Sequence, residues 1–209
     1  MDVRKTVEEI RLVPVVVIDD AADAIQTAEA LKAGGVPIME ITLRTKAGLA
    51  AIETVAKGID DIIVGAGTVL TQDQANNAIS AGAQFVVLPG FDANIVSLCL
   101  EKGVPVFPGC VTPTEIMVAM NMGLDVLKFF PANVYGGIKA IKALSGPFPD
   151  VRFIPTGGAD GSNLKDFLIP QVFAVGGGWL CPRADIKAKN FSAITAACAE
   201  AAGIVKAKD

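Results

Sequence analysis

The sequence contains no histidine. This absence excludes a catalytic triad built on histidine, and it excludes most of the ligand sets of zinc enzymes. If the chain is an enzyme, its proton transfers must be carried by Glu, Asp, Lys or Cys side chains, by the single Tyr135, or by water.

The sequence has no CxxC cysteine pair, and we expect neither a leader nor a membrane span. Its four cysteines form no CxxC pair, so we expect free thiols in a reducing compartment. The first residues are not typical of a signal peptide, and no apolar run approaches the length of a membrane span. These absences predict a cytoplasmic protein with no membrane partner.

Charge is sparse, because charged residues make up 19% of the chain and apolar residues 52%. The net charge of −4 gives no reason to expect nucleic acid or an anionic membrane surface as a partner. A chain of 209 residues is long enough for one sizeable core, and we expect a single domain over residues 1–209. The high apolar fraction favours a large core together with an oligomer interface.

Apolar strands alternate with helical stretches along the whole chain, after a short helix predicted over 2–11. The predicted strands are 13–18, 36–43, 61–65, 84–88, 104–107, a run within 124–132, 151–154 and 172–175. This alternation indicates a parallel sheet with both faces covered by helices. Eight such units predict a (β/α)8 TIM barrel with an extra N-terminal helix, and an open doubly wound sheet is the alternative.

The sixth predicted strand carries one lysine among apolar residues. Alternation of side chains places Val126, Lys128 and Phe130 on one face of this strand. A buried ammonium group is costly unless it is paired or neutralised, and a neutral, positioned amine can attack a ketone to form a Schiff base. The alternative is a lysine at the strand end whose ammonium group reaches water.

The second predicted strand places Glu40, Thr42 and Arg44 on one face. Glu40 lies within the apolar run, where a carboxylate is suited to act as a base. Arg44 lies at the strand exit, where a guanidinium is suited to bind an anion. The alternative is an internal ion pair that only satisfies two charges.

Glycine-rich segments follow three of the predicted strands, namely Gly65-Ala66-Gly67-Thr68, Thr156-Gly157-Gly158 and Gly176-Gly177-Gly178. The glycines before Thr68 let a ligand approach the backbone, although a threonine there is also typical of a helix cap. Phosphate-binding barrels commonly hold the anion on backbone N–H groups of the seventh and eighth loops. The last two segments therefore predict a phosphate site, with plain turns as the alternative.

Four motifs, in order and covering nearly the whole chain, carry a family resemblance: Glu40-Ile-Thr-Leu-Arg44, Gly65-Ala-Gly-Thr68, Lys128-Phe-Phe-Pro131 and Pro155-Thr-Gly-Gly158. Together they resemble the bacterial 2-keto-3-deoxy-6-phosphogluconate (KDPG) aldolase / 4-hydroxy-2-oxoglutarate (KHG) aldolase family. The resemblance implies a trimeric (β/α)8 class I aldolase without metal or organic cofactor. It implies cleavage of KDPG to pyruvate and glyceraldehyde 3-phosphate, and of KHG to pyruvate and glyoxylate.

The same resemblance implies a role for individual residues. Lys128 is the Schiff-base lysine and Glu40 the general acid/base. Arg44 and Thr68 hold the carboxylate region of pyruvate, Pro89 and Phe130 line the pocket, and the two glycine loops receive the phosphate. The implied substrate-binding residues are Arg44, Thr68, Pro89, Phe130, Thr156, Gly157, Gly158, Gly177 and Gly178.

Two positions depart from the family pattern. Gly178 stands where the family often has a serine whose hydroxyl contacts phosphate, and Leu88 stands where it commonly has another serine. The residues leave several alternatives open: another keto-acid aldolase of this family, such as a phosphogalactonate type; a non-covalent phosphate-binding isomerase or decarboxylase; and a catalytically silent binding barrel.

Overall fold

The computed structural model describes residues 2–208, so the outermost residues of the predicted domain, Met1 and Asp209, lie outside the described residues. The eight strands within this part are β1 Leu12–Val16, β2 Ile38–Thr42, β3 Ile63–Gly67, β4 Val86–Val87, β5 Val106–Phe107, β6 Val126–Phe129, β7 Arg152–Pro155 and β8 Val175–Gly177. The α-helices are α1 Val3–Ile10, α2 Ala24–Ala33, α3 Gly48–Gly58, α4 Gln72–Ser80, α5 Ala93–Glu101, α6 Pro113–Asn121, α7 Gly137–Leu144, α8 Leu164–Phe167, α9 Arg183–Lys187 and α10 Phe191–Lys206.

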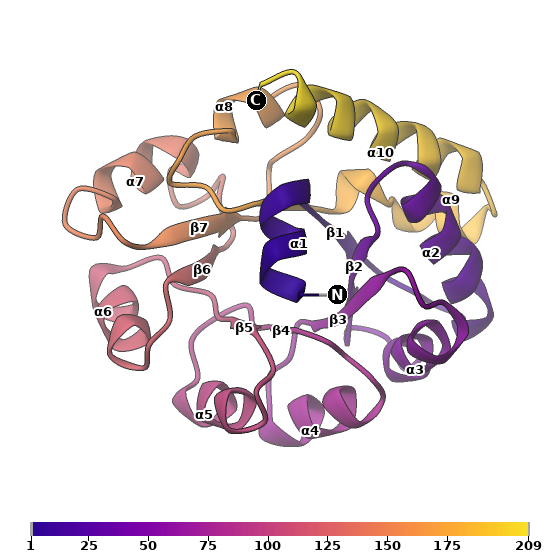
Figure 1. Cartoon of the computed structure of the whole chain (residues 1–209), viewed down its shortest axis with the longest axis horizontal. Helices are drawn as coiled ribbons and strands as arrows, with labels where there is room; N and C mark the ends of the chain where they lie inside the picture. Colours follow the sequence, from indigo (N-terminus) through magenta and orange to yellow (C-terminus); the bar gives the residue numbers. More distant parts are fainter. Residues whose placement is uncertain (1, 209) are drawn as a thin grey trace.

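Six strands form one curled parallel sheet in the order β5-β4-β3-β2-β1-β8, and β6 and β7 form a second parallel pair. Single parallel bridges connect the two groups. One joins Gly109 to Lys128, and two others join Phe153 to Val172 and Thr156 to Gly176. Figure 1 shows the strands around the middle of an α/β fold, with the helices that follow them on the outside.

Buried side chains form an inner and an outer layer because successive residues of a strand point to opposite sides. The outer layer packs between strands and helices, and includes Leu127 and Phe129 of β6. The inner layer takes residues from all around the sheet: Val13, Ile38, Ile63, Phe85, Val87, Phe107, Val126, Ile154 and Phe173. Val3 and Val7 of α1 pack against this inner layer, so the helix closes the end at which the strands begin.

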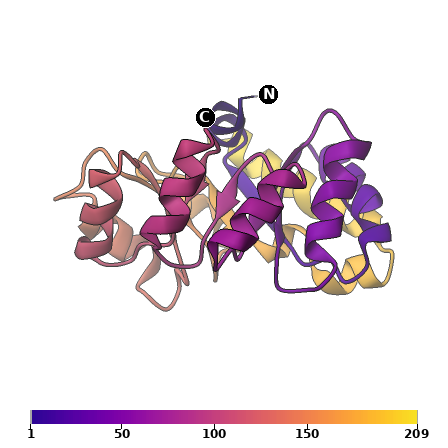
Figure 2. The same cartoon turned by 90° about the horizontal axis from the view of Figure 1, so that it is seen from below.

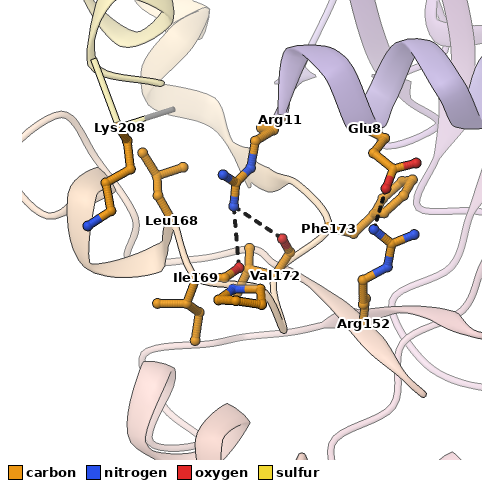
Figure 3. A pocket seen from close by; sticks show the side chains of 9 residues that line it. Glu8, Arg11, Arg152, Leu168, Ile169, Val172, Phe173 and Lys208 are labelled. Atoms are coloured by element: carbon orange, nitrogen blue, oxygen red, sulfur yellow. Dashed lines mark hydrogen bonds and ion pairs between the residues drawn. The ribbon is translucent and has the colours of Figure 1, made fainter. Parts of the chain in front are cut away.

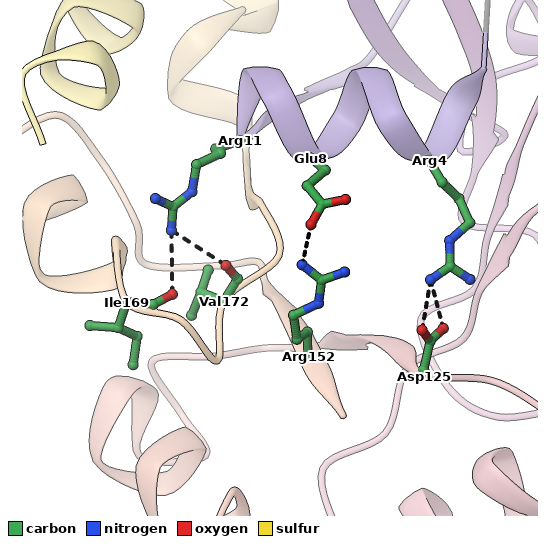
Figure 4. A network of polar contacts seen from close by, with 7 residues as sticks. All are labelled: Arg4, Glu8, Arg11, Asp125, Arg152, Ile169 and Val172. Atoms are coloured by element: carbon green, nitrogen blue, oxygen red, sulfur yellow. Dashed lines mark hydrogen bonds and ion pairs between the residues drawn. The ribbon is translucent and has the colours of Figure 1, made fainter. Parts of the chain in front are cut away.

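Two ion pairs attach α1 to the separate strand pair, as Figure 4 shows. Arg4 donates two hydrogen bonds of 2.8 Å to the carboxylate of Asp125, which directly precedes β6. Arg152, the first residue of β7, donates to Glu8 at 2.5 Å. In the view of Figure 2, turned by 90°, α1 lies at one face of the molecule. No helix within residues 2–208 has the length and apolar composition needed to cross a membrane.

The structure confirms the predicted alternation of eight strands and helices but shifts two strands. The third strand is Ile63–Gly67 rather than 61–65, and the eighth is Val175–Gly177 rather than 172–175. The position of the eighth strand is determined by its pairing with β1, in which Leu12 is in register with Val175. Two of the three glycines placed in the eighth loop therefore belong to the strand. A 3-10 helix, η2 (Gly178–Leu180), and α9 follow β8, and neither is predicted from the sequence.

Candidate active site

A lysine of the separate β6–β7 pair and a glutamate of the six-stranded sheet meet in the interior. The Lys128 ammonium nitrogen lies 3.1 Å from Oε1 of Glu40, and the two side chains are 7% and 3% exposed. A lysine reaching water at a strand end is therefore the wrong alternative. An internal Glu40–Arg44 pair is also wrong, because Glu40 pairs with Lys128 while Nε of Arg44 donates to Thr42 Oγ1 at 3.3 Å.

The backbone of Lys128 is fixed on both sides. β6 pairs with β7, with Lys128 opposite Ile154. On the other side, the N–H of Lys128 donates to the carbonyl of Pro108, and its carbonyl accepts from the N–H of Cys110, each at 2.9 Å. The ammonium nitrogen lies 5.3 Å from the centre of the Phe130 ring, a distance suited to a cation–π contact. These contacts hold the amine in one position without exposing it.

Glycines of β3 provide the space that Glu40 occupies. A Cβ at Gly67 would overlap the carboxylate of Glu40, and a Cβ at Gly65 would overlap the ring of Phe85. Neighbouring side chains therefore fill the space where a Cβ would lie, and the prediction that these glycines admit a ligand to the backbone stays a prediction. Thr68, just beyond, has a φ of 56°, an uncommon left-handed conformation for a residue other than glycine.

A cavity of about 330 Å³ opens at the carboxyl ends of β1, β2, β6, β7 and β8. The residues that line it are Val15, Val17, Arg44, Phe130, Thr156, Gly157, Gly158, Ala159, Gly177, Gly178, Cys181 and Arg183. Seven of the nine predicted substrate-binding residues are among them. The other two, Thr68 and Pro89, follow β3 and β4 and lie outside this lining.

The glycines of this cavity differ in the room around them. Gly157 and Gly158 have φ values of 93° and 84°, in the left-handed region that favours glycine. At Gly177 the ring of Trp179 already fills the place of a side chain. At Gly178 the nearest atom to an added Cβ is the carbonyl oxygen of Val15 at 3.7 Å, an ordinary contact distance.

Two arginines and no carboxylate line the cavity, so its charge suits an anion. Arg183 donates to the carboxylate of Asp19 through Nε at 2.8 Å and Nη2 at 2.6 Å. The hydrogen bond from Arg183 holds the pKa of Asp19 below its ordinary value, and Asp19 in turn raises the pKa of Arg183. Arg183 is not among the residues predicted from the sequence, and the one signal for it there is a basic residue soon after the eighth strand.

The buried thiols are poor candidates for catalysis. Burial raises the pKa of Cys99 to about 11, and burial is also the main cause that raises those of Cys110 and Cys198 to about 12 and lifts that of Cys181 further. All four remain protonated thiols near neutral pH, and none is in a disulfide, as expected from the sequence. Within residues 2–208, no three His, Cys, Asp or Glu side chains come together as a metal site.

A larger cavity of about 390 Å³ lies at the opposite end, beneath α1 (Figure 3). Three of its charged side chains, Glu8, Arg11 and Arg152, have protein partners. Arg152 binds Glu8 and lies 4.6 Å above the Phe173 ring, and Arg11 donates to the carbonyls of Ile169 and Val172 at 3.3 and 3.5 Å. None of the predicted site residues lines it.

Known proteins match this chain over most of its length. The sequence model of the KDPG and KHG aldolase family matches residues 3–197. The 2-dehydro-3-deoxy-phosphogluconate aldolase of Treponema pallidum is 45% identical over 193 residues, which cover 92% of each chain. The KHG/KDPG aldolase of Escherichia coli K12 is 42% identical over 91% of this chain and 90% of that one. A solved KDPG aldolase from Legionella pneumophila, with pyruvate captured at low pH as a covalent carbinolamine intermediate, has 38% identity and a TM-score of 0.90 over 94% of this chain and 96% of that one.

Proposed function

Because the chain belongs to the KDPG and KHG aldolase family, we propose that it is a class I aldolase, a carbon–carbon lyase, with Lys128 as the Schiff-base residue. The substrates proposed are KDPG, cleaved to pyruvate and glyceraldehyde 3-phosphate, and KHG, cleaved to pyruvate and glyoxylate. The observation that carries the proposal is the buried 3.1 Å contact between Lys128 and Glu40, with the Lys128 amine 5.3 Å from Phe130, which lines a cavity that also holds two arginines.

The reaction begins with transfer of one proton from the Lys128 ammonium group, for which Glu40 is the nearest acceptor. The neutral amine attacks C2 of the keto acid and forms a carbinolamine; Glu40 returns its proton to the carbinolamine hydroxyl group, which leaves as water and gives an iminium ion, so that Glu40 is ionised again. Glu40, through a water molecule, then accepts the proton of the C4 hydroxyl group. The C3–C4 bond breaks as its electrons move into the iminium, and the aldehyde leaves.

The enamine that remains is protonated at C3 by the same glutamate. Water hydrolyses the resulting iminium, which frees pyruvate and restores the amine of Lys128. No electron acceptor or metal enters this sequence, since the iminium is the electron sink. One carboxylate positioned by Gly67 therefore serves alternately as base and as acid.

The cavity lining supports one orientation of the substrate. The ring of Phe130 lies beside the ammonium group, so the reacting ketone carbon would lie near Phe130. Arg44, with Thr68 after the neighbouring strand, is proposed to bind the carboxylate. The phosphate would then extend toward Thr156–Gly158 and Gly177–Gly178, which line the cavity; the N–H of Thr156 already donates to the carbonyl of Phe129, so the glycine N–H groups are the proposed donors. Pro89 is retained as a proposed pocket residue beside these groups.

We also propose a closed (β/α)8 barrel with an extra N-terminal helix, as a single domain, assembled as a homotrimer. The bridges from Gly109 to Lys128 and from Thr156 to Gly176, at the two junctions between the strand groups, support closure. Large apolar side chains that remain exposed support an interface: Leu70, Leu100, Met117, Val118, Val134 and Tyr135. Light scattering tests the trimer, and a stable monomer at micromolar concentration would contradict it.

The function is tested by following pyruvate release from KDPG and from KHG separately, with equal yields of pyruvate and aldehyde expected. Lys128→Met should release none, whereas Lys142→Met, which changes an exposed lysine of α7, should behave as the parent protein. A non-covalent isomerase or decarboxylase, or a silent binding barrel, predicts no aldehyde from either keto acid.

A further inference from the structure

We propose that Arg183 binds the phosphate group of the phosphorylated keto acid and thereby sets the preference for phosphorylated over unphosphorylated substrates. The inference rests on the proposed aldolase function of this cavity. Arg183 lines the cavity together with Gly177 and Gly178, and it follows β8 through the short η2 turn.

The charges of the cavity match those of such a substrate. A phosphorylated keto acid carries a carboxylate near its reacting ketone and a phosphate at its far end. The cavity presents Arg44 beyond β2 and Arg183 beyond β8, and β1 lies between these two strands in the sheet. The two arginines therefore reach the cavity from separate strands, one for each anionic group.

Arg183 has hydrogen-bond donors to spare. A guanidinium group has five N–H donors, and Asp19 accepts from two of them, through Nε and Nη2. The side chains of Arg183 and Asp19 are 59% and 45% exposed, and exposed ion pairs of this kind contribute little to stability. Asp19 thus orients the guanidinium while its remaining donors stay available for the two oxygens of a phosphate.

The neighbouring glycine explains why an arginine would be needed here. Gly178 brings a backbone N–H but no hydroxyl, and the space beside it is open as far as the carbonyl of Val15. A guanidinium supplies both donors and positive charge, so Arg183 compensates for the missing hydroxyl rather than adding to a complete site.

The test compares Arg183→Gln with Lys187→Gln, a change of equal charge in the same helix. Lys187 borders the hollow beside Asp19 but does not line the cavity. For Arg183→Gln, the KM for KDPG should rise by about tenfold or more, the range for hydrogen bonds to a charged group. The KM for KHG and both kcat values should stay within about twofold, as should every constant of Lys187→Gln. Arg183→Lys, which keeps the charge but loses the planar fork, should give an intermediate rise.

A second measurement separates this inference from the proposed function. Titration calorimetry with inorganic phosphate does not depend on turnover, and Arg183→Gln should bind phosphate about tenfold more weakly than Lys187→Gln does. Equal effects on both keto acids, equal effects of the two variants, or unchanged phosphate affinity would overturn the assignment of Arg183. A parent protein that binds phosphate through Arg183 but releases no pyruvate would overturn the aldolase proposal instead.

Discussion

The two ends of the strands hold cavities of similar size but opposite character. Beneath α1 the cavity measures about 390 Å³, and its guanidinium groups already contact Glu8 or backbone carbonyls. At the other end the cavity measures about 330 Å³; Lys128 and Glu40 are almost entirely buried and do not line it, but its lining residue Phe130 lies 5.3 Å from the Lys128 amine. The larger cavity is therefore not the better candidate for chemistry.

The ion pairs at the two ends of the strands differ in how far their side chains are exposed. Arg4 and Asp125, beneath α1, have side chains that are 45% and 50% exposed, whereas those of Lys128 and Glu40 are 7% and 3% exposed. An exposed pair contributes about 0–1 kcal/mol, whereas removing one partner of a buried pair costs about 3–5 kcal/mol. One end thus uses charges to attach a helix, and the other keeps a costly buried pair, to which the proposed mechanism assigns the reaction.

Among the variants considered, Lys128→Met should have the largest effect on both stability and activity. It leaves the Glu40 carboxylate buried without a partner, so we expect unfolding free energy to fall by about 3–5 kcal/mol and pyruvate release to stop. Urea denaturation measures the first effect and a pyruvate assay the second. The double variant Lys128→Met/Glu40→Gln should recover most of the stability but none of the activity. A double variant no more stable than the single one would contradict the claim that the unpaired Glu40 carboxylate causes the loss of stability.

Glu40→Gln removes the proposed acid/base and keeps the shape of the side chain. We expect kcat to fall by about 10²–10⁴-fold, while covalent capture of pyruvate persists. Glu8→Gln is the matched change beneath α1 and should leave kcat unchanged. If the kcat of Glu40→Gln stays within a few-fold of the parent value, another group moves the proton.

Gly67→Ala tests the packing that positions Glu40. The added methyl group overlaps the carboxylate, so we expect a loss of about 1–3 kcal/mol in stability and a lower kcat. Gly203→Ala, in α10, is the control, because nothing lies within 4 Å of its added methyl group. Thermal unfolding and steady-state kinetics measure both variants. Equal behaviour of the two would mean that Gly67 does not position the glutamate.

Gly178→Ser restores a hydroxyl at the cavity without a steric clash. One added hydrogen bond to phosphate should lower the KM for KDPG by about tenfold, less where water already occupies that position. The KM for KHG, which has no phosphate, should not change. A shift of both constants would indicate that the loop acts through folding.

Asp125→Asn gives the smallest expected effect. It removes the charge of an exposed pair beneath α1, so unfolding free energy should change by no more than about 1 kcal/mol and kcat should not change. Urea denaturation of Asp125→Asn and of Lys128→Met under the same conditions measures the difference in unfolding free energy directly. A loss as large as that of Lys128→Met would contradict the distinction between the two ends.

Local patterns predicted much of this architecture. Alternation placed Val126, Lys128 and Phe130 on one face, and the structure places Val126 in the inner core and Phe130 at the cavity. The caps observed at Thr71, Asp92 and Thr112 are local features of the same kind, since each side chain accepts a hydrogen bond from the backbone N–H three residues later. Such features depend on residues a few positions apart, which is why they are visible in the sequence.

Long-range features were not predictable in this way. Lys128 and Glu40 are 88 positions apart, so their contact depends on the curvature of the whole sheet. The eighth strand was placed too early because glycines are rare in strands, whereas here close neighbours of Gly176 and Gly177 leave no room for side chains. α9 has five residues, too few for a periodic pattern, and it carries Arg183. The roles assigned to the site residues stay predictions.

Borohydride reduction in the presence of pyruvate, followed by peptide mass mapping, tests the central claim most directly. The account predicts one pyruvyl adduct, on the peptide that contains Lys128, and no adduct in Lys128→Met. The Glu40→Gln variant should still be labelled. A label on an exposed lysine of α7, such as Lys139 or Lys142, or an active enzyme that traps no pyruvate, would contradict the assignment of Lys128 as the Schiff-base residue.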